Sequence, residues 1–220
     1  MKQLNQKPYK EEKFIKNNMS PGDSKESPDE SFIFIDAGFL SKLSKYLGNG
    51  KYLRYHLINF AERLCLKQKL DCTKIYYYTA PPFQSNMPTK NEELRKKNYD
   101  KFIEKILQSK KVILREGRCQ RLKINNCYEF NQKAVDSLAI MDLMEVPLKN
   151  KNIKKIVLIA CDSDFVPVVK RLEEHGIKTI LYTYYQKSRD ENFSTSNQLV
   201  KSVWKYTILT KDDFDKAPLT

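Results

Sequence analysis

The chain has 220 residues and a mass of 25.9 kDa, which suits one domain with a tail and allows a substantial buried core. Apolar residues make up 40% of it, and no stretch approaches the about 20 apolar residues of a membrane span. The formal net charge of +13 favours a polyanionic partner, with nucleic acid as the first candidate. A generally lysine-rich composition would produce the same excess.

The two ends of the chain are expected to be tails. Residues 1–30 are polar and charged without hydrophobic periodicity, and we expect them to be disordered. They lack the apolar segment of a secretory signal. The five cysteines form no C-x-x-C pair, which predicts reduced thiols and a cytoplasmic location. One domain is expected over 31–210, followed by a C-terminal tail over 211–220.

The first half of the domain alternates short apolar segments with segments of helical period. A buried strand is expected at 32–36, and a short helix from Phe39 to Leu47. Apolar residues at three- and four-residue steps predict an amphipathic helix over 51–69. The next elements in chain order are a strand over 74–79, a helix over 91–109, a strand over 111–116 and a loop or hairpin over 117–130.

The second half continues the alternation. A helix over 132–146 is apolar nearly all round and should be buried. A strand over 154–160 leads into a helix from Val166, for which Gly176 is the expected stop. The remaining elements are a strand over 177–183, a short helix over 196–203 and a final strand over 204–209. Strands alternating with helices predict an α/β fold with a parallel sheet covered on both faces.

The segment IVLIACDSDF, from Ile156 to Phe165, carries the strongest chemical signal. Five apolar residues run as a buried strand towards Asp162, Ser163 and Asp164. Two carboxylates about 5 Å apart repel by roughly 3 kcal/mol at an effective dielectric of about 20. Either one carboxylate keeps its proton or a cation lies between them.

Two further aspartates are expected at the same crevice. Asp36 ends the first strand, and Asp136 lies in the first turn of the helix over 132–146, where complementation of the helix dipole is the alternative role. Ligands bind beyond the carboxyl ends of strands in open α/β sheets. Four converging carboxylates predict Mg²⁺ or Mn²⁺ rather than Zn²⁺, and two ions about 4 Å apart could clamp the oxygens of a phosphodiester. Asp142 points about 120° away from Asp136 and suits a structural or supporting role.

Basic residues interleaved with aromatic residues follow the third strand. Such a pattern suits single-stranded nucleic acid, because charges track the phosphates and rings stack on bases, although a solvated charged face is the alternative. Lys133 precedes Asp136 by three residues and either contacts a phosphate or is a solvated lysine at a helix start. The expected substrate-binding residues are Arg115, Arg118, Arg121, Lys123, Lys133 and Ser163, near Tyr128 and Phe130.

Five segments, in chain order, resemble the NYN domain, and more narrowly its LabA-like branch within the PIN-like nuclease superfamily: FIDAGFL, YYYTAPP, LREGR, QKAVDSLAIMDL and LIACDSDFVPVVKRLEEHGIKTIL. The resemblance covers about 31–210. It implies a three-layer Rossmann-like (PIN-like) fold with a central mostly parallel sheet and an acidic metal site. In many members it implies metal-dependent ribonuclease activity.

The acidic site of the family falls on the aspartates that the spacing selects, Asp36, Asp136, Asp162 and Asp164. Two departures stand out. Phe39 replaces an Asn that many members carry three positions after the first Asp, and Ala134 replaces the Gly of the usual K-G-V-D. Neither removes a carboxylate, but the first removes a polar group.

We therefore expect a metal-dependent ribonuclease that hydrolyses RNA phosphodiester bonds with water as the nucleophile. Asp36, Asp162 and Asp164 would hold the principal Mg²⁺ or Mn²⁺ ion, and Asp136 would complete the site or help to hold a second ion. The alternative is a non-catalytic RNA-binding or regulatory module. RNA, single-stranded by preference, is the expected partner, no membrane partner is expected, and self-association is left open.

Overall fold

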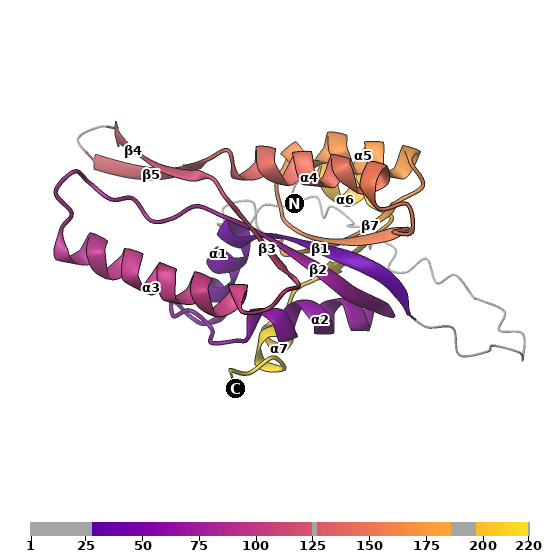
Figure 1. Cartoon of the computed structure of the whole chain (residues 1–220), viewed down its shortest axis with the longest axis horizontal. Helices are drawn as coiled ribbons and strands as arrows, with labels where there is room; N and C mark the ends of the chain where they lie inside the picture. Colours follow the sequence, from indigo (N-terminus) through magenta and orange to yellow (C-terminus); the bar gives the residue numbers. More distant parts are fainter. Residues whose placement is uncertain (1–27, 125–126, 186–196, 220) are drawn as a thin grey trace, which may run out of the picture.

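The structure is a computed structural model that describes residues 28–124, 127–185 and 197–219. A six-stranded sheet forms its centre, with all strands parallel and the order β3-β2-β1-β6-β7-β8 (Figure 1). A separate two-stranded hairpin, β4-β5, is antiparallel. The sheet strands are β1 (Asp29–Asp36), β2 (Leu70–Thr79), β3 (Val112–Glu116), β6 (Lys155–Ile159), β7 (Lys178–Thr183) and β8 (Lys205–Ile208). The predicted α/β fold with a mostly parallel sheet is confirmed.

Helices cover both faces of the sheet and make three layers. In β1, Ile33 and Ile35 pack into one core, while Phe32 and Phe34 pack into the other, as the two-residue period of a strand requires. The first core is closed by α1 (Ala37–Leu47), α2 (Leu57–Lys67), α3 (Lys90–Leu107) and α7 (Lys211–Asp215). The second core is closed by α4 (Val135–Lys149), α5 (Val166–Glu174) and α6 (Asn197–Ser202).

The strand order creates a crevice at the centre of the sheet. From β1 the chain builds outward through β2 and β3, and it then returns to add β6 on the other side of β1. The direction of winding therefore reverses between β1 and β6, and the helices that follow these two strands leave to opposite faces. Such a reversal opens a crevice beyond the carboxyl ends of the two strands, which is where ligands bind in doubly wound sheets.

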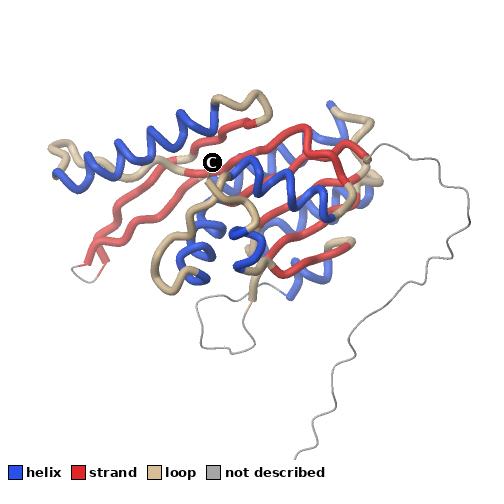
Figure 2. Tube along the Cα trace, turned by 90° about the horizontal axis from the view of Figure 1, so that it is seen from below, coloured by secondary structure: helices blue, strands red, loops and turns tan. Residues whose placement is uncertain are grey.

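The hairpin consists of β4 (Arg118–Ile124) and β5 (Cys127–Lys133) and resolves the open prediction for 117–130. It leaves the sheet at Gly117, where a Cβ atom would collide with the Lys133 carbonyl oxygen, so the base of the hairpin requires glycine. Two views place the hairpin and α3 beyond the same side of the sheet (Figures 1 and 2). The two elements therefore form one projecting arm.

Two helix boundaries differ from the prediction because tertiary contacts set them. Residues 51–56 are not helical: Leu53 N–H donates to Ser44 Oγ at 2.9 Å, and α2 begins only after His56, whose Nδ1 accepts from Asn59 N–H at 3.3 Å. The helix expected from residue 132 begins at Val135, because β5 continues to Lys133.

The expectation that α4 is buried all round is wrong. Met141 is 63% exposed and Leu148 is 70% exposed, so only one side of the helix packs on the sheet. The predicted stop of α5 is confirmed. Gly176 has a φ of +77°, and Ile177 N–H donates to the Leu172 carbonyl at 2.9 Å, which closes the helix.

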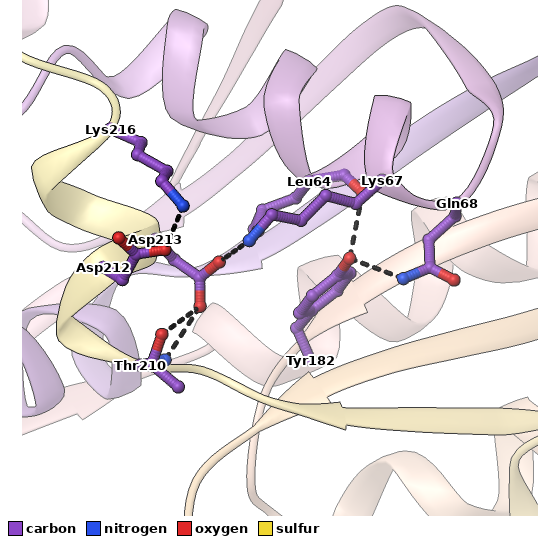
Figure 3. Close-up of polar contacts among 8 residues, drawn as sticks. All are labelled: Leu64, Lys67, Gln68, Tyr182, Thr210, Asp212, Asp213 and Lys216. Carbon is purple, nitrogen blue, oxygen red and sulfur yellow. Dashed lines mark hydrogen bonds and ion pairs between the residues drawn. The ribbon is translucent and has the colours of Figure 1, made fainter.

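The ends of the chain depart from the expected tails where the structure describes them. The segment 211–220 contains α7, and Phe214 is buried in the first core. Asp213 holds this helix in place: it accepts from the Thr210 N–H at 2.8 Å and forms an ion pair with Lys67 of α2 (Figure 3). Residues 29 and 30, which were expected in the disordered segment, belong to β1, and residues 1–27 lie outside the described residues. None of the described helices is long and apolar enough to cross a membrane.

Candidate active site

A cavity of about 750 Å³ opens at the carboxyl edge of the sheet, at the reversal between β1 and β6. Three aspartates from separate elements line it: Asp36 at the end of β1, Asp136 in the first turn of α4, and Asp162 after β6. Strand ends that lie far apart in sequence are thus brought to one cavity by parallel pairing. We call this cavity the acidic pocket.

Asp36 is held firmly by the chain that follows it. Its side chain caps α1, and Oδ1 accepts from the Phe39 N–H at 3.1 Å. Burial, together with the negative charges of Asp136 and Asp162, raises the pKa of Asp36 to about 6, although the hydrogen bonds that it accepts from the Phe39 and Gly38 N–H groups oppose the increase. The cap fixes the carboxylate at the mouth of the crevice, and the raised pKa marks an environment where a proton or a cation is favoured.

Asp136 lies at a helix start that has no side-chain cap. The preceding residue, Ala134, adopts a left-handed conformation with a φ of 68°. This explains why glycine is usual at that position, since a side chain is disfavoured there. Burial raises the pKa of Asp136, and the charges of Asp162 and Asp164 contribute to the increase. The carboxylates are therefore close enough to repel one another.

Asp162 and Asp164 differ in their positions. Asp162 Oδ1 accepts from the Asp164 N–H at 3.0 Å and caps the short 3-10 turn Ser163–Phe165. Asp164 is exposed and does not line the pocket, so the structure gathers three of the expected aspartates and leaves the fourth at the rim. Ser163 is exposed beside Asp162, with its Oγ 3.4 Å from Asp162 Oδ1.

The donor chemistry of the site fits a hard divalent cation, because the pocket presents carboxylate oxygens. Among the described residues, no lysine, arginine or histidine forms a salt bridge with any of the four aspartates. Over the same ranges, however, no three His, Cys, Asp or Glu side chains converge closely enough to form a ready-made metal shell. The charge suits a cation, but the side chains do not stand in a coordinating arrangement.

Asp142 serves the fold, in line with its expected structural role. Its Oδ2 accepts from the Tyr78 hydroxyl at 3.0 Å and from Arg115 Nε at 2.8 Å, and its Oδ1 accepts from Arg115 Nη2 at 3.1 Å. These contacts tie α4 to β2 and β3 beneath the hairpin. They also occupy the guanidinium of Arg115, which the sequence places with the substrate-binding residues.

The basic residues of the hairpin divide between its two faces. Arg121 pairs across the strands with Phe130, and Lys123 pairs with Tyr128, so these four side chains share one face. The Arg121 guanidinium lies 4.7 Å from the Phe83 ring centre and 4.6 Å from that of Tyr128. Alternation along the strand places Arg118 on the opposite face.

Lys133 is exposed at the end of β5. The expectation that it lies in the first turn of the helix that carries Asp136 is wrong, because Lys133 ends β5 and the chain turns through Ala134 before α4 begins. Sequence reasoning also missed part of the pocket wall. The lining residues that it missed include Ser41 and Lys42 on α1, Tyr99 and Phe102 on α3, and Asn131 and Gln132 on β5. Among these six, only the three-residue spacing of the two aromatic residues on one helix is a signal in the sequence.

Comparison with known families identifies the chain. A model of the NYN domain matches residues 32–209. No curated protein matches the chain. The LabA-like branch is not distinguished by this match and stays a prediction. NYN domains are in general nucleases that act on RNA. Because the match covers most of the chain, reaches all six strands of the parallel sheet and includes the three aspartates of the acidic pocket, the chain belongs to the NYN domain family.

Proposed function

We propose that this chain is a cytoplasmic, metal-dependent ribonuclease that hydrolyses RNA phosphodiester bonds at the acidic pocket. The observation that supports this most directly is the pocket itself. Three carboxylates from three elements line one cavity at the reversal of the sheet, and burial and mutual repulsion raise the pKa values of two of them. A site that stores repulsion between carboxylates favours a divalent cation, and a nuclease uses such a cation at the scissile phosphate.

In this proposal Asp36, Asp136 and Asp162 would hold a Mg²⁺ or Mn²⁺ ion, and Asp164 at the rim would supply further negative charge for it or for a second ion. A bound ion would supply positive charge that attracts the phosphate and activates water. The chain contributes orientation, because backbone N–H groups fix the carboxylates of Asp36 and Asp162. Since Asp36 has a pKa of about 6, cation binding competes with protons and should strengthen as the pH rises through 6.

The hairpin supplies the proposed path for the RNA strand. Arg121 and Lys123 share a face with Tyr128 and Phe130, and this combination suits a single strand whose phosphates meet the charges and whose bases meet the rings. Arg118, Lys133 and Ser163 are exposed and stay in the proposal as RNA contacts, with Arg118 and its cross-strand partner Lys133 on the other face of the hairpin. Arg115 leaves it, because Asp142 occupies its guanidinium.

A cleavage assay tests the proposal. Purified protein is incubated with single-stranded and with structured RNA, in Mn²⁺ or in EDTA, and binding is measured in parallel. We expect the protein to cleave RNA in Mn²⁺ and not in EDTA. Asp162→Asn should bind RNA as well as the wild type or better, because a negative charge is gone, but should not cut it. Asp71→Asn, an exposed carboxylate at the amino end of β2, is the matched control and should cut normally.

One observation favours the alternative of a non-catalytic RNA-binding module. Phe39 stands where many family members carry Asn, and its side chain is only 4% exposed, so this position offers the pocket no polar side chain. The same assay separates the two functions. Wild-type protein that binds RNA and never cuts it in Mn²⁺ would establish the binding module and remove the nuclease.

A further inference from the structure

The acidic pocket has a second, aromatic end. Tyr99 and Phe102 of α3 and Phe130 of β5 line the same cavity as the aspartates. The Phe102 ring lies 5.8 Å from that of Tyr77, tilted by 59°, and this contact fixes it in the wall. Phe130 is placed from the other side by Phe83, at 5.6 Å between ring centres. Rings from two separate elements of the arm therefore meet in one cavity.

The packing of the fold does not account for these rings. Phe102 is 39% exposed and Phe130 is 46% exposed, so both leave apolar surface open inside a cavity that also contains charged groups. Tyr99 is oriented by a hydrogen bond, because its hydroxyl donates to Glu116 Oε1 at 2.5 Å. Flat, oriented and partly open rings of this kind are surfaces on which another ring can stack.

One side-chain amide connects the aromatic end with the acidic end. Gln132 of β5 lines the pocket and lies two residues from Phe130, on the same face of the hairpin. A Cβ atom placed on Gly38 would lie 3.2 Å from Gln132 Oε1 and 3.2 Å from Asp36 Oδ1, so the Gln132 amide reaches the same spot as the Asp36 carboxylate. This amide offers both a donor group and an acceptor, which is what the polar edge of a nucleobase requires.

We propose that the aromatic end is a base-binding subsite, which takes one unpaired nucleobase of the RNA strand while the adjoining phosphate lies at the acidic end. This inference rests on the proposed function and names the substrate class of the site. A cavity of about 750 Å³ has room for a nucleotide, since ligand pockets run from about 300 to about 1,000 Å³. A base inside a duplex has both faces stacked and its edge paired, so it enters such a pocket only after it is pulled out of the helix.

Charges on the arm suit an entering strand. Arg95 of α3 lies 6.0 Å from the Phe130 ring centre, and Arg121 is the cross-strand partner of Phe130, with its guanidinium beside the rings of Phe83 and Tyr128. Positive charge therefore flanks the aromatic end on both elements of the arm, where the phosphates that adjoin a bound base would pass. The subsite accordingly selects unpaired RNA over duplex RNA.

Fluorescence in EDTA tests the subsite without any cleavage. The probe is a short single-stranded RNA that contains 2-aminopurine, whose emission is quenched when the base stacks on an aromatic ring. We expect wild-type protein to quench it, and Phe130→Leu and Phe102→Leu each to lose quenching and to weaken binding by about fivefold to a hundredfold. Trp204→Leu, an exposed aromatic residue next to the amino end of β8, is the control and should behave as the wild type.

The outcomes separate this inference from the proposed function. Full quenching by both leucine variants, with melting curves that show them folded, would overturn the subsite, and so would equal affinity for duplex and single-stranded RNA. Quenching that depends on Phe130 and Phe102, in a protein that cuts no RNA in Mn²⁺, would keep the subsite and remove the nuclease. If Phe130→Leu and Phe102→Leu quench as the wild type does and still cut RNA in Mn²⁺, the nuclease would be kept and the subsite removed.

Discussion

Asp36→Asn should make the metal-free protein more stable at neutral pH while destroying the proposed site. Asn keeps the oxygen that accepts from the Phe39 N–H, and Asn and Asp are equally good at capping a helix. What the substitution removes is a negative charge that burial and two neighbouring aspartates make unfavourable. A substitution in a proposed catalytic residue that stabilises the fold would reveal strain stored for function.

The magnitude follows from the pKa. An increase from 3.8 to about 6 corresponds to about 3 kcal/mol of unfavourable free energy for the ionised carboxylate, at about 1.4 kcal/mol for each pKa unit. Between these two values the folded protein binds more protons than the unfolded chain, so stability falls as the pH rises from about 4 to about 6 and the loss remains above that. Desolvation of the new amide offsets part of the gain, which leaves about 1–3 kcal/mol at pH 7.5.

Urea unfolding at a series of pH values measures this. The difference in unfolding free energy between Asp36→Asn and the wild type should be near zero below pH 4 and should grow to its full value above pH 6. Asp71→Asn, with an exposed carboxylate, should stay within about 0.5 kcal/mol of the wild type throughout. In Mn²⁺ at a thousand times the dissociation constant the order should reverse, because the wild type gains about 4.1 kcal/mol and the variant gains far less.

A difference that does not change with pH would refute this reasoning, because it would mean that Asp36 ionises as it would in water. Stabilisation of Asp36→Asn by Mn²⁺ equal to that of the wild type would place the cation elsewhere.

Other substitutions test the surroundings of the site. Ala134→Gly should raise the free energy of unfolding by about 1 kcal/mol, because a left-handed alanine costs more than the extra chain entropy of glycine. Lys69→Gly, at a φ of 58°, should raise it by a similar amount. A lower free energy of unfolding in urea for either variant would contradict this reasoning. Arg115→Leu should lower the free energy of unfolding by about 2 kcal/mol, because it removes the cation that pairs with Asp142. A decrease of less than about 0.5 kcal/mol would show that this ion pair contributes little to stability. Arg121→Gln should weaken RNA binding and reduce the slope of log K against log salt by about 0.7, whereas an unchanged slope would remove Arg121 from the RNA path.

The sequence by itself determined the architecture and the acidic residues, because both are written in local patterns. The apolar segments 32–36 and 154–160 are short and flanked by helical periods, and burial of a strand on two faces leaves that signature wherever it occurs. Once the sheet is parallel, strand-end residues such as Asp36 and Asp162 must emerge at one edge, so the pocket could be anticipated without a structure.

The tertiary structure alone decided the arm and the partners of its charges. The hairpin left no clear period in 117–130, because neither of its faces is buried and nothing forces apolar residues to alternate. Arg115 pairs with Asp142 across 27 positions of sequence, a contact set by how α4 lies on the sheet. The aromatic end of the pocket likewise joins Phe102 and Phe130 from two elements, and no local pattern encodes the distance between elements that pack side by side.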